Sequence, residues 1–126
     1  MARIVAIDDD ILFLEVMRTA LGKQEGHTVF TADNPSIGLT LVENIHPDLI
    51  ILDVCFPTCF APDFLKIMHS NPALADIPIV IITGGSSMLV QADELQSQNV
   101  REIATKPIDL DSLLALVKRH LPEQPC

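Results

Sequence analysis

Residues 49–53 read LIILD, four aliphatic side chains in a row that end at an aspartate. A continuous apolar run of this length is typical of a strand covered on both faces, as the strands of a parallel sheet are. Because parallel strands end at the same edge of a sheet, and ligands bind at that carboxyl edge, the residue that closes such a run is a candidate site residue. Three more runs also end at polar residues: Arg3–Ile7 before Asp8-Asp9, Pro78–Ile82 before Thr83, and Arg101–Thr105 before Lys106-Pro107.

Segments of helix length separate these runs. A helix is expected from about Ile11 to Leu21, with Asp10 as its N-cap, and further helices over about 63–70 and 86–97 and from Asp109 to 121. With a short strand over 27–32, the chain alternates five strands with five helices. This pattern predicts an α/β fold, a doubly wound five-stranded parallel sheet between two layers of helices.

The second helix has a clear start signal. Asn34-Pro35 places an N-cap residue before a proline at the first helical position. Ile37, Leu41 and Ile45 then recur at helical spacing, and we expect them to line the inner face of this helix.

Composition limits the classes of function. The 126 residues are enough for one domain, expected over 1–121 with a short C-terminal tail over 122–126. The net charge of −9, from 17 acidic and 8 basic residues, opposes direct nucleic-acid binding by this domain. Apolar runs are too short for membrane spans, and three cysteines form no disulfide framework. We therefore expect a soluble, cytoplasmic protein with free thiols.

Three carboxylates, a hydroxyl and an ammonium would share the carboxyl edge of this sheet. Crowded carboxylates are stabilised by a cation, and oxygen ligands without thiol or imidazole favour Mg²⁺, with Mn²⁺ as the alternative. A carboxylate at the position of Asp53 can attack phosphorus and form an acyl phosphate. Taken singly, Asp53, Thr83 and Lys106 could equally be ordinary turn or surface residues; their joint placement at strand ends is what indicates a site.

The chain resembles the receiver domain of two-component response regulators, a flavodoxin-like fold related to the chemotaxis regulators. The resemblance covers essentially the whole chain and rests on four segments: RIVAIDDD (3–10), HPDLIILDVCFP (46–57), SNPALADIPIVIITGG (70–85) and IATKPIDLDSLL (103–114). It implies the strand order 2-1-3-4-5.

The resemblance also implies the roles of individual residues. Asp53 matches the phosphoacceptor and would also belong to the metal site. Asp9 matches the direct Mg²⁺ ligand, and Asp8 the acid that acts on the ion mostly through water. Cys55, two residues after the phosphoacceptor, would give the metal its backbone carbonyl. Thr83 matches the switch hydroxyl.

The matching lysine of the family is Lys106, followed by a proline that is usually cis. By resemblance, a sensor histidine kinase or a histidine phosphotransfer protein would supply the phosphoryl group. The receiver would catalyse only its own phosphorylation and dephosphorylation, as a signalling switch rather than an enzyme with an external substrate. It would then act on a downstream protein target or on an output domain that this sequence lacks.

Two departures from the family pattern affect the expected switch. Ile103 stands where the family often has an aromatic residue coupled to the switch hydroxyl, and the loop over 58–62 is longer and lacks glycine. A phosphorylation-independent docking module is therefore one alternative. A haloacid-dehalogenase-type phosphatase is another, but it needs a second aspartate where Cys55 stands. A nucleotide-binding domain would need a glycine-rich loop after the first strand, where three aspartates stand instead.

Overall fold

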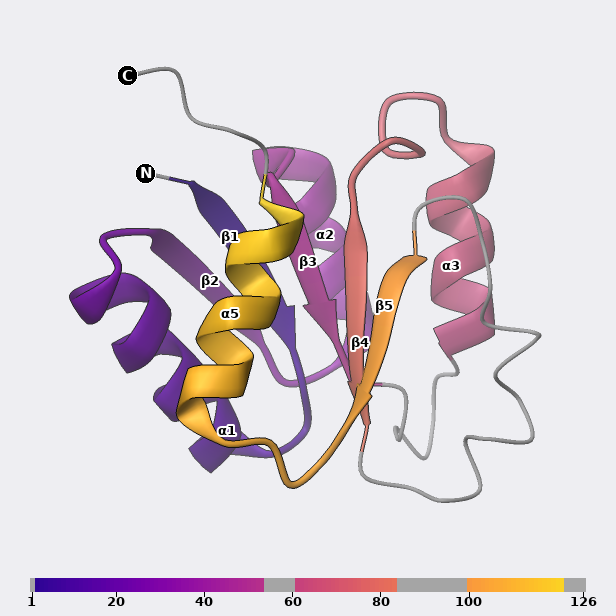
Figure 1. The fold of residues 1–126 in the computed structure, drawn as a ribbon. Coiled ribbons are helices and arrows are strands. Elements are labelled where there is room, and N and C mark those ends of the chain that lie inside the picture. Colours follow the sequence, from indigo (N-terminus) through magenta and orange to yellow (C-terminus); the bar gives the residue numbers. More distant parts are fainter. Residues whose placement is uncertain (1, 54–60, 84–99, 122–126) are drawn as a thin grey trace.

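The computed structural model describes residues 2–53, 61–83 and 100–121 of the chain. Its five strands are β1 (Arg3–Ile7), β2 (Thr28–Ala32), β3 (Leu49–Leu52), β4 (Ile79–Thr83) and β5 (Val100–Thr105). They form one parallel sheet in the order β2-β1-β3-β4-β5 (Figure 1). The predicted fold class and strand order are confirmed.

Helices cover both faces of this sheet. On one face lie α1 (Ile11–Met17) and α5 (Leu110–His120), and on the other lie α2 (Pro35–Ile45) and α3 (Ala61–Ser70). A π-helical segment, η1 (Arg18–Gln24), directly follows α1. The helix predicted over 86–97 lies outside the described residues. No helix in the described part of the chain has both the length and the apolar character needed to cross a membrane.

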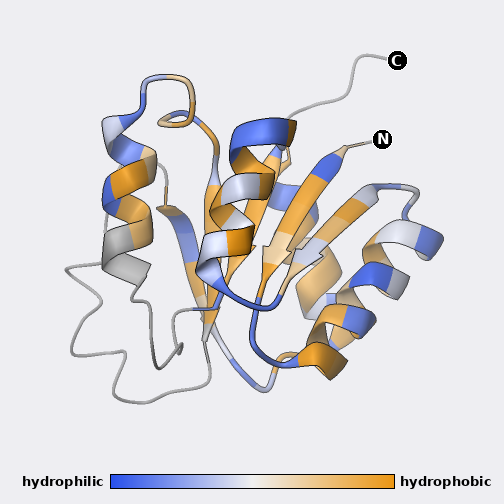
Figure 2. Ribbon diagram, turned by 180° about the vertical axis from the view of Figure 1, so that it is seen from behind, coloured by the Kyte–Doolittle hydropathy of each residue, from blue (hydrophilic) through white to orange (hydrophobic). Residues whose placement is uncertain are grey.

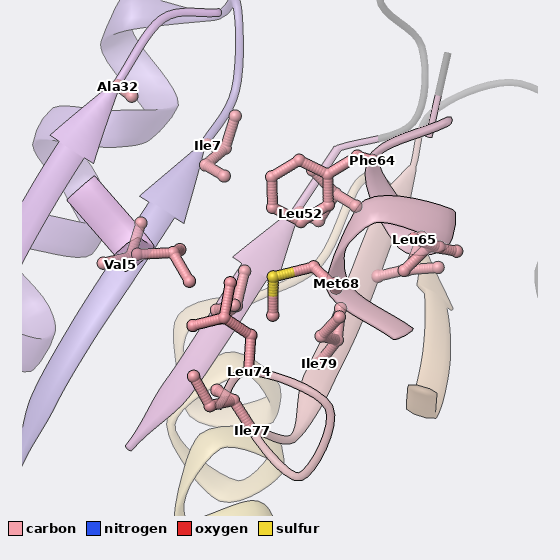
Figure 3. Packing of buried hydrophobic residues seen from close by; sticks show 13 residues of the cluster. Val5, Ile7, Ala32, Leu52, Phe64, Leu65, Met68, Leu74, Ile77 and Ile79 are labelled. Carbon is pink, nitrogen blue, oxygen red and sulfur yellow. The ribbon is translucent and has the colours of Figure 1, made fainter. Parts of the chain in front are cut away.

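The strands β1, β3 and β4 are mostly apolar because both of their faces are buried, and Figure 2 shows the sheet as a largely hydrophobic layer. Val5, Ile50 and Leu52 pack toward α2 and α3, in the cluster drawn in Figure 3. Their neighbours Ile4 and Ile51 point the other way, toward α1 and α5. This alternation explains why β1 and β3 read as continuous aliphatic runs rather than as alternating polar and apolar residues.

The edge strand β5 differs from the predicted buried strand. None of its residues is fully buried: Arg101 and Thr105 are exposed and the other four are half-buried, because only β4 pairs with it. An edge strand that pairs on one side only keeps part of its backbone and side chains in contact with water. The expectation that all four polar-ended runs are buried is therefore correct for β1, β3 and β4 and wrong for β5.

The predicted N-caps of three helices are confirmed, but the first helix differs from its prediction. Asp10, Asn34 and Asp109 each cap a helix with a side-chain oxygen that accepts from backbone N–H groups. The first helix, predicted as one α-helix to residue 21, changes to π-helical hydrogen bonding at Arg18. Such a change leaves no mark in the apolar periodicity from which the helix was predicted.

The inner face of α2 is not the one predicted. Ile37 is 51% exposed, and the buried positions are Pro35, Gly38 and Val42. Residues four apart advance about 40° beyond one full turn at each step, so Ile37, Leu41 and Ile45 span a wide arc. Ile37 lies at the solvent end of that arc, and Leu41 and Ile45 are half-buried.

Gly38 sets how closely α2 approaches β1. A Cβ atom at this position would lie 2.6 Å from Ile7 Cγ1, far inside van der Waals contact. We expect Gly38→Ala to lower the free energy of unfolding by about 1 kcal/mol, because overpacking outweighs the better helix propensity of alanine. Urea denaturation followed by circular dichroism measures this change. Gly22→Ala is the matched control, since its Cβ would meet nothing nearer than 3.6 Å; equal stability of both variants would contradict the prediction.

Candidate functional site

Two neighbouring strands deliver one aspartate each to the carboxyl edge of the sheet. Asp8 follows β1, and its backbone N–H donates to the Ala32 carbonyl at 3.1 Å. Asp53 follows β3, and its backbone N–H donates to the Ile7 carbonyl at 2.9 Å. The parallel ladder thus continues one residue beyond the strands and fixes the backbone of both aspartates next to each other.

The side chains form an acidic cluster. Carboxylate oxygens of Asp8, Asp9 and Asp53 all lie within 4.8 Å of one another. Asp8 is 1% exposed and Asp53 4% exposed, whereas Asp9 is exposed. Two buried carboxylates at this separation repel each other strongly unless positive charge is nearby.

Lys106 supplies positive charge to this cluster from the end of β5. Its ammonium lies 2.7 Å from Asp8 Oδ2 and 3.5 Å from Asp53 Oδ2. The peptide bond between Lys106 and Pro107 is cis, as predicted. The lysine therefore bridges the two buried carboxylates.

The environment shifts the acidity of this pair. Burial, with a further contribution from the charge of Asp53, raises the pKa of Asp8 to about 6, although hydrogen bonds from Lys106 and from the Asp10 N–H oppose the shift. Burial alone would lower the pKa of Lys106, but the hydrogen bond and negative charge of Asp8, together with Asp53, raise it above its ordinary value. Lys106 is thus held as an ammonium, and Asp8 is an acid that takes up a proton more readily than usual.

The donor set fits a small divalent cation. The cluster consists of carboxylate oxygens, with no thiol or imidazole among the three residues. Hard oxygen ligands of this kind suit Mg²⁺ or Mn²⁺, which bind through one or two carboxylates and keep several waters. Asp9, exposed at the rim, leaves the cluster accessible to a hydrated ion.

Two other predicted site residues are described only in part or not at all. Thr83 is the last residue of β4, and its backbone pairs in register with Thr105, directly before Lys106. Its backbone therefore ends at the same edge as the acidic cluster. Cys55 lies outside the described residues, as do most of the loop over 58–62 and the whole of the segment 84–99.

Sequence reasoning did not find one neighbour of the lysine. The Lys106 ammonium lies over the ring of Phe13, 4.5 Å from the ring centroid. The sequence predicted a helix over this segment but gave Phe13 no role in the site. The only signal in the sequence was a large aromatic residue in that helix.

Comparison with known proteins agrees with this geometry. Residues 4–118 match the family model of the response regulator receiver domain. The chain is 27% identical to Protein PilH of Pseudomonas aeruginosa, over 96% of this chain and 98% of that protein. It is 28% identical to Protein Rrf1 of Nitratidesulfovibrio vulgaris, over 95% of this chain and 83% of that one.

The fold is shared with a solved chemotaxis regulator. The structure of the chemotaxis response regulator CheY4 of Vibrio cholerae superimposes with a TM-score of 0.85 at 26% identity, covering 96% of this chain and 99% of that one. The family match spans nearly all of the five-stranded sheet and its helices. The chain belongs to the response regulator receiver domains of two-component systems.

Proposed function

We propose that this domain accepts a phosphoryl group on Asp53, with Mg²⁺ bound beside it, and thereby switches its contacts with a partner protein. The observation that supports this most is the placement of Asp53. It is a buried carboxylate at the carboxyl edge of the sheet, grouped with Asp8 and Asp9 and reached by the Lys106 ammonium. A sensor histidine kinase or histidine phosphotransfer protein is the proposed donor, as the family membership suggests.

The proposed reaction is a transfer between a histidine and a carboxylate. An oxygen of Asp53 forms a bond to phosphorus while the bond between phosphorus and the donor's imidazole nitrogen breaks. The electron pair of the broken bond stays on the imidazole, which leaves as the free side chain. The product is an acyl phosphate on Asp53, a known form of carboxylate nucleophilic catalysis.

Asp8, Asp9 and Asp53, with the backbone carbonyl of Cys55, are the proposed holders of the metal ion. When bound, Mg²⁺ would supply positive charge that screens the phosphoryl oxygens from the acidic cluster. Asp8 and Asp9 contribute by being held close to Asp53, within 4.8 Å, before any ion arrives. Because the strand ends fix these carboxylates, little rearrangement is needed to form the site.

Lys106 and Thr83 are proposed to receive the phosphoryl group. Lys106 already lies 3.5 Å from Asp53 and can move from Asp8 to a phosphoryl oxygen once the new negative charge appears. The hydroxyl of Thr83, at the end of β4, is the proposed second donor. Its engagement would repack the surface formed by β5, α5 and the segment between β4 and β5, where a downstream protein or an output domain would bind.

Phosphorylation of the isolated domain tests this proposal. We expect incubation with acetyl phosphate and Mg²⁺ to add about 80 Da, the mass of one phosphoryl group on a carboxylate, and to do so in a labile form. Intact-mass spectrometry records the gain, and removal of the metal with EDTA is expected to prevent it. If the domain binds Mg²⁺ but gains no mass, a phosphorylation-independent docking module becomes the better description.

Binding of Mg²⁺ is expected to depend on pH through Asp8. The raised pKa of Asp8, about 6 in the metal-free protein, means that this carboxyl takes up a proton as the pH falls through that value. Proton and metal compete for the same oxygens, so the apparent Kd should rise by up to about tenfold per pH unit below about pH 6. Above about pH 7 the Kd should be constant.

Isothermal titration calorimetry suits this measurement, because the chain contains no Trp or Tyr to report binding by fluorescence. The Asp8→Asn variant is the matched control. It should bind Mg²⁺ more weakly at every pH but lose the dependence near pH 6. An affinity for the wild-type domain that does not change between about pH 7 and pH 5 would contradict the assignment of Asp8 to the metal site.

A further inference from the structure

A closed series of contacts links Lys106 to the start of α1. Lys106 donates to Asp8 Oδ2 at 2.7 Å, and the other oxygen of Asp8 accepts from the Asp10 N–H at 2.8 Å. Asp10 Oδ1 in turn accepts from the backbone N–H of Phe13 at 3.3 Å. The ring of Phe13 returns to the Lys106 ammonium, 4.5 Å from the ring centroid. The cap of α1 and the charge network of the site are therefore one structure.

The Phe13 ring is held in this position from its other side as well. Phe13 is half-buried and packs against the core cluster between α1, α5 and the sheet, beside Ile108. With Lys106, Pro107 and Ile108 it lines a surface hollow of about 380 Å³. Core packing thus restrains the ring, which also borders the hollow.

We propose that Phe13 is a positioning residue that holds the Lys106 ammonium beside Asp53 for phosphoryl transfer. This inference rests on the proposed phosphorylation of Asp53. The ammonium lies over the ring, and the negative face of an aromatic ring attracts a cation. Asp10 contributes by fixing the backbone that carries the ring.

A ring suits this task better than a further carboxylate. In the proposed reaction, Lys106 leaves Asp8 and donates to a phosphoryl oxygen on Asp53. A third contact, beside those with Asp8 and Asp53, should therefore limit the movement of the ammonium without holding it at one position. Attraction to a ring face changes little over a small sideways movement, whereas a hydrogen bond to an acid is directional. The flexible four-carbon stem of a lysine loses much rotamer freedom when it is held in one place, so a ring that restrains it beforehand favours the transition state.

Replacing Phe13 by phenylalanines with increasing numbers of fluorine atoms distinguishes the attraction of the ring for the Lys106 ammonium from the packing of the ring in the core. Fluorinated phenylalanines weaken the attraction of the ring for a cation in steps while nearly keeping its shape. With saturating Mg²⁺, we expect the rate of phosphorylation by acetyl phosphate to fall with each added fluorine, and to be about fivefold lower in Phe13→Leu. Phe13→Tyr should react at nearly the wild-type rate, because its ring presents a similar negative face to the ammonium.

Proton NMR gives a second readout, of the contact itself. The ε-methylene protons of Lys106 should be shifted upfield by the ring in the wild-type domain, and this shift should disappear in Phe13→Leu. Phe30→Leu is the matched control for loss of a half-buried ring: Phe30 lies on β2 and packs against the opposite core cluster. It should change neither the shift nor the rate.

Two results would overturn the inference. One is a wild-type spectrum without the upfield shift, which would mean that the ring contact does not exist in solution. The other is a rate that is unchanged by fluorination and by Phe13→Leu, which would mean that the contact does not position the lysine. If the wild-type domain accepts no phosphoryl group at all, the proposed function itself fails, and the inference fails with it.

Discussion

Asp53→Asn is expected to abolish the gain of about 80 Da on incubation with acetyl phosphate and Mg²⁺, because an amide cannot act as the nucleophile. Asp53 is the proposed phosphoacceptor, and its carboxylate is buried, only 4% exposed. Asparagine has nearly the same shape, so the strand end and its hydrogen bond to Ile7 should persist. Intact mass, with circular dichroism to verify folding, measures the effect.

The control for this variant is Asp76→Asn. Asp76 is an exposed aspartate before β4, at the opposite end of the sheet. Its replacement should leave the rate and extent of phosphorylation unchanged. Full phosphorylation of Asp53→Asn would contradict the account, since another residue would then be the acceptor.

Lys106→Met is expected to reduce the rate of phosphorylation about a hundredfold, the usual effect of removing one preorganised donor from a charged transition state. The ammonium lies 2.7 Å from Asp8 and 3.5 Å from Asp53, so its loss leaves two buried carboxylates without the cation between them. Methionine keeps most of the length and apolar volume of the lysine stem. The difference in rate therefore reports the charge rather than the packing.

Intact-mass spectrometry of samples quenched at timed intervals measures the phosphorylation rates of the wild type and of Lys106→Met. Saturating Mg²⁺ ensures that metal binding does not limit either rate. The control is Lys118→Met. Lys118 is exposed in the last turn of α5, far from the cluster, so this variant loses the same charge but should be phosphorylated at the wild-type rate. Equal rates for Lys106→Met and Lys118→Met would show that the bridging ammonium takes no part in the transfer.

The central part of the fold was predictable because its physical signals are local. Apart from Arg3 and Thr83 at their ends, β1, β3 and β4 are apolar, and such runs occur where helices cover both faces of a parallel sheet. The helix starts at Asp10, Asn34 and Asp109 were predictable because a capping side chain acts on N–H groups two or three residues away. In each case the cause lies within a few residues of its effect.

What could not be predicted depends on contacts between distant segments. Ile37 matches a helical stripe, yet it is exposed because Gly38 and Val42 are the positions that meet β1 and the core. The partial exposure of β5 follows from its place at the edge of the sheet, which is a property of the strand order. The apolar periodicity of a single segment predicts neither the exposure of Ile37 nor the partial exposure of β5.

The same distinction applies to the site. The grouping of these site residues follows once the strands are known to be parallel. Asp8, Asp53 and Lys106 each come directly after a strand, and Asp9 comes directly after Asp8. The Phe13 ring beside Lys106 does not follow, because it requires the rotation of α1 about its axis as well as the rotamers of both side chains. Strand ends determine which residues meet, and helix packing determines what surrounds them.

Mapping the phosphorylated residue tests the central claim most directly. Reduction of an aspartyl phosphate with borohydride converts that side chain to the alcohol of homoserine, which tandem mass spectrometry can locate in a proteolytic digest. After incubation with acetyl phosphate and Mg²⁺, we predict homoserine at position 53 and at no other aspartate. Homoserine at position 8 or 9 in place of 53, or a stable phosphoryl group on a histidine or serine, would contradict the account.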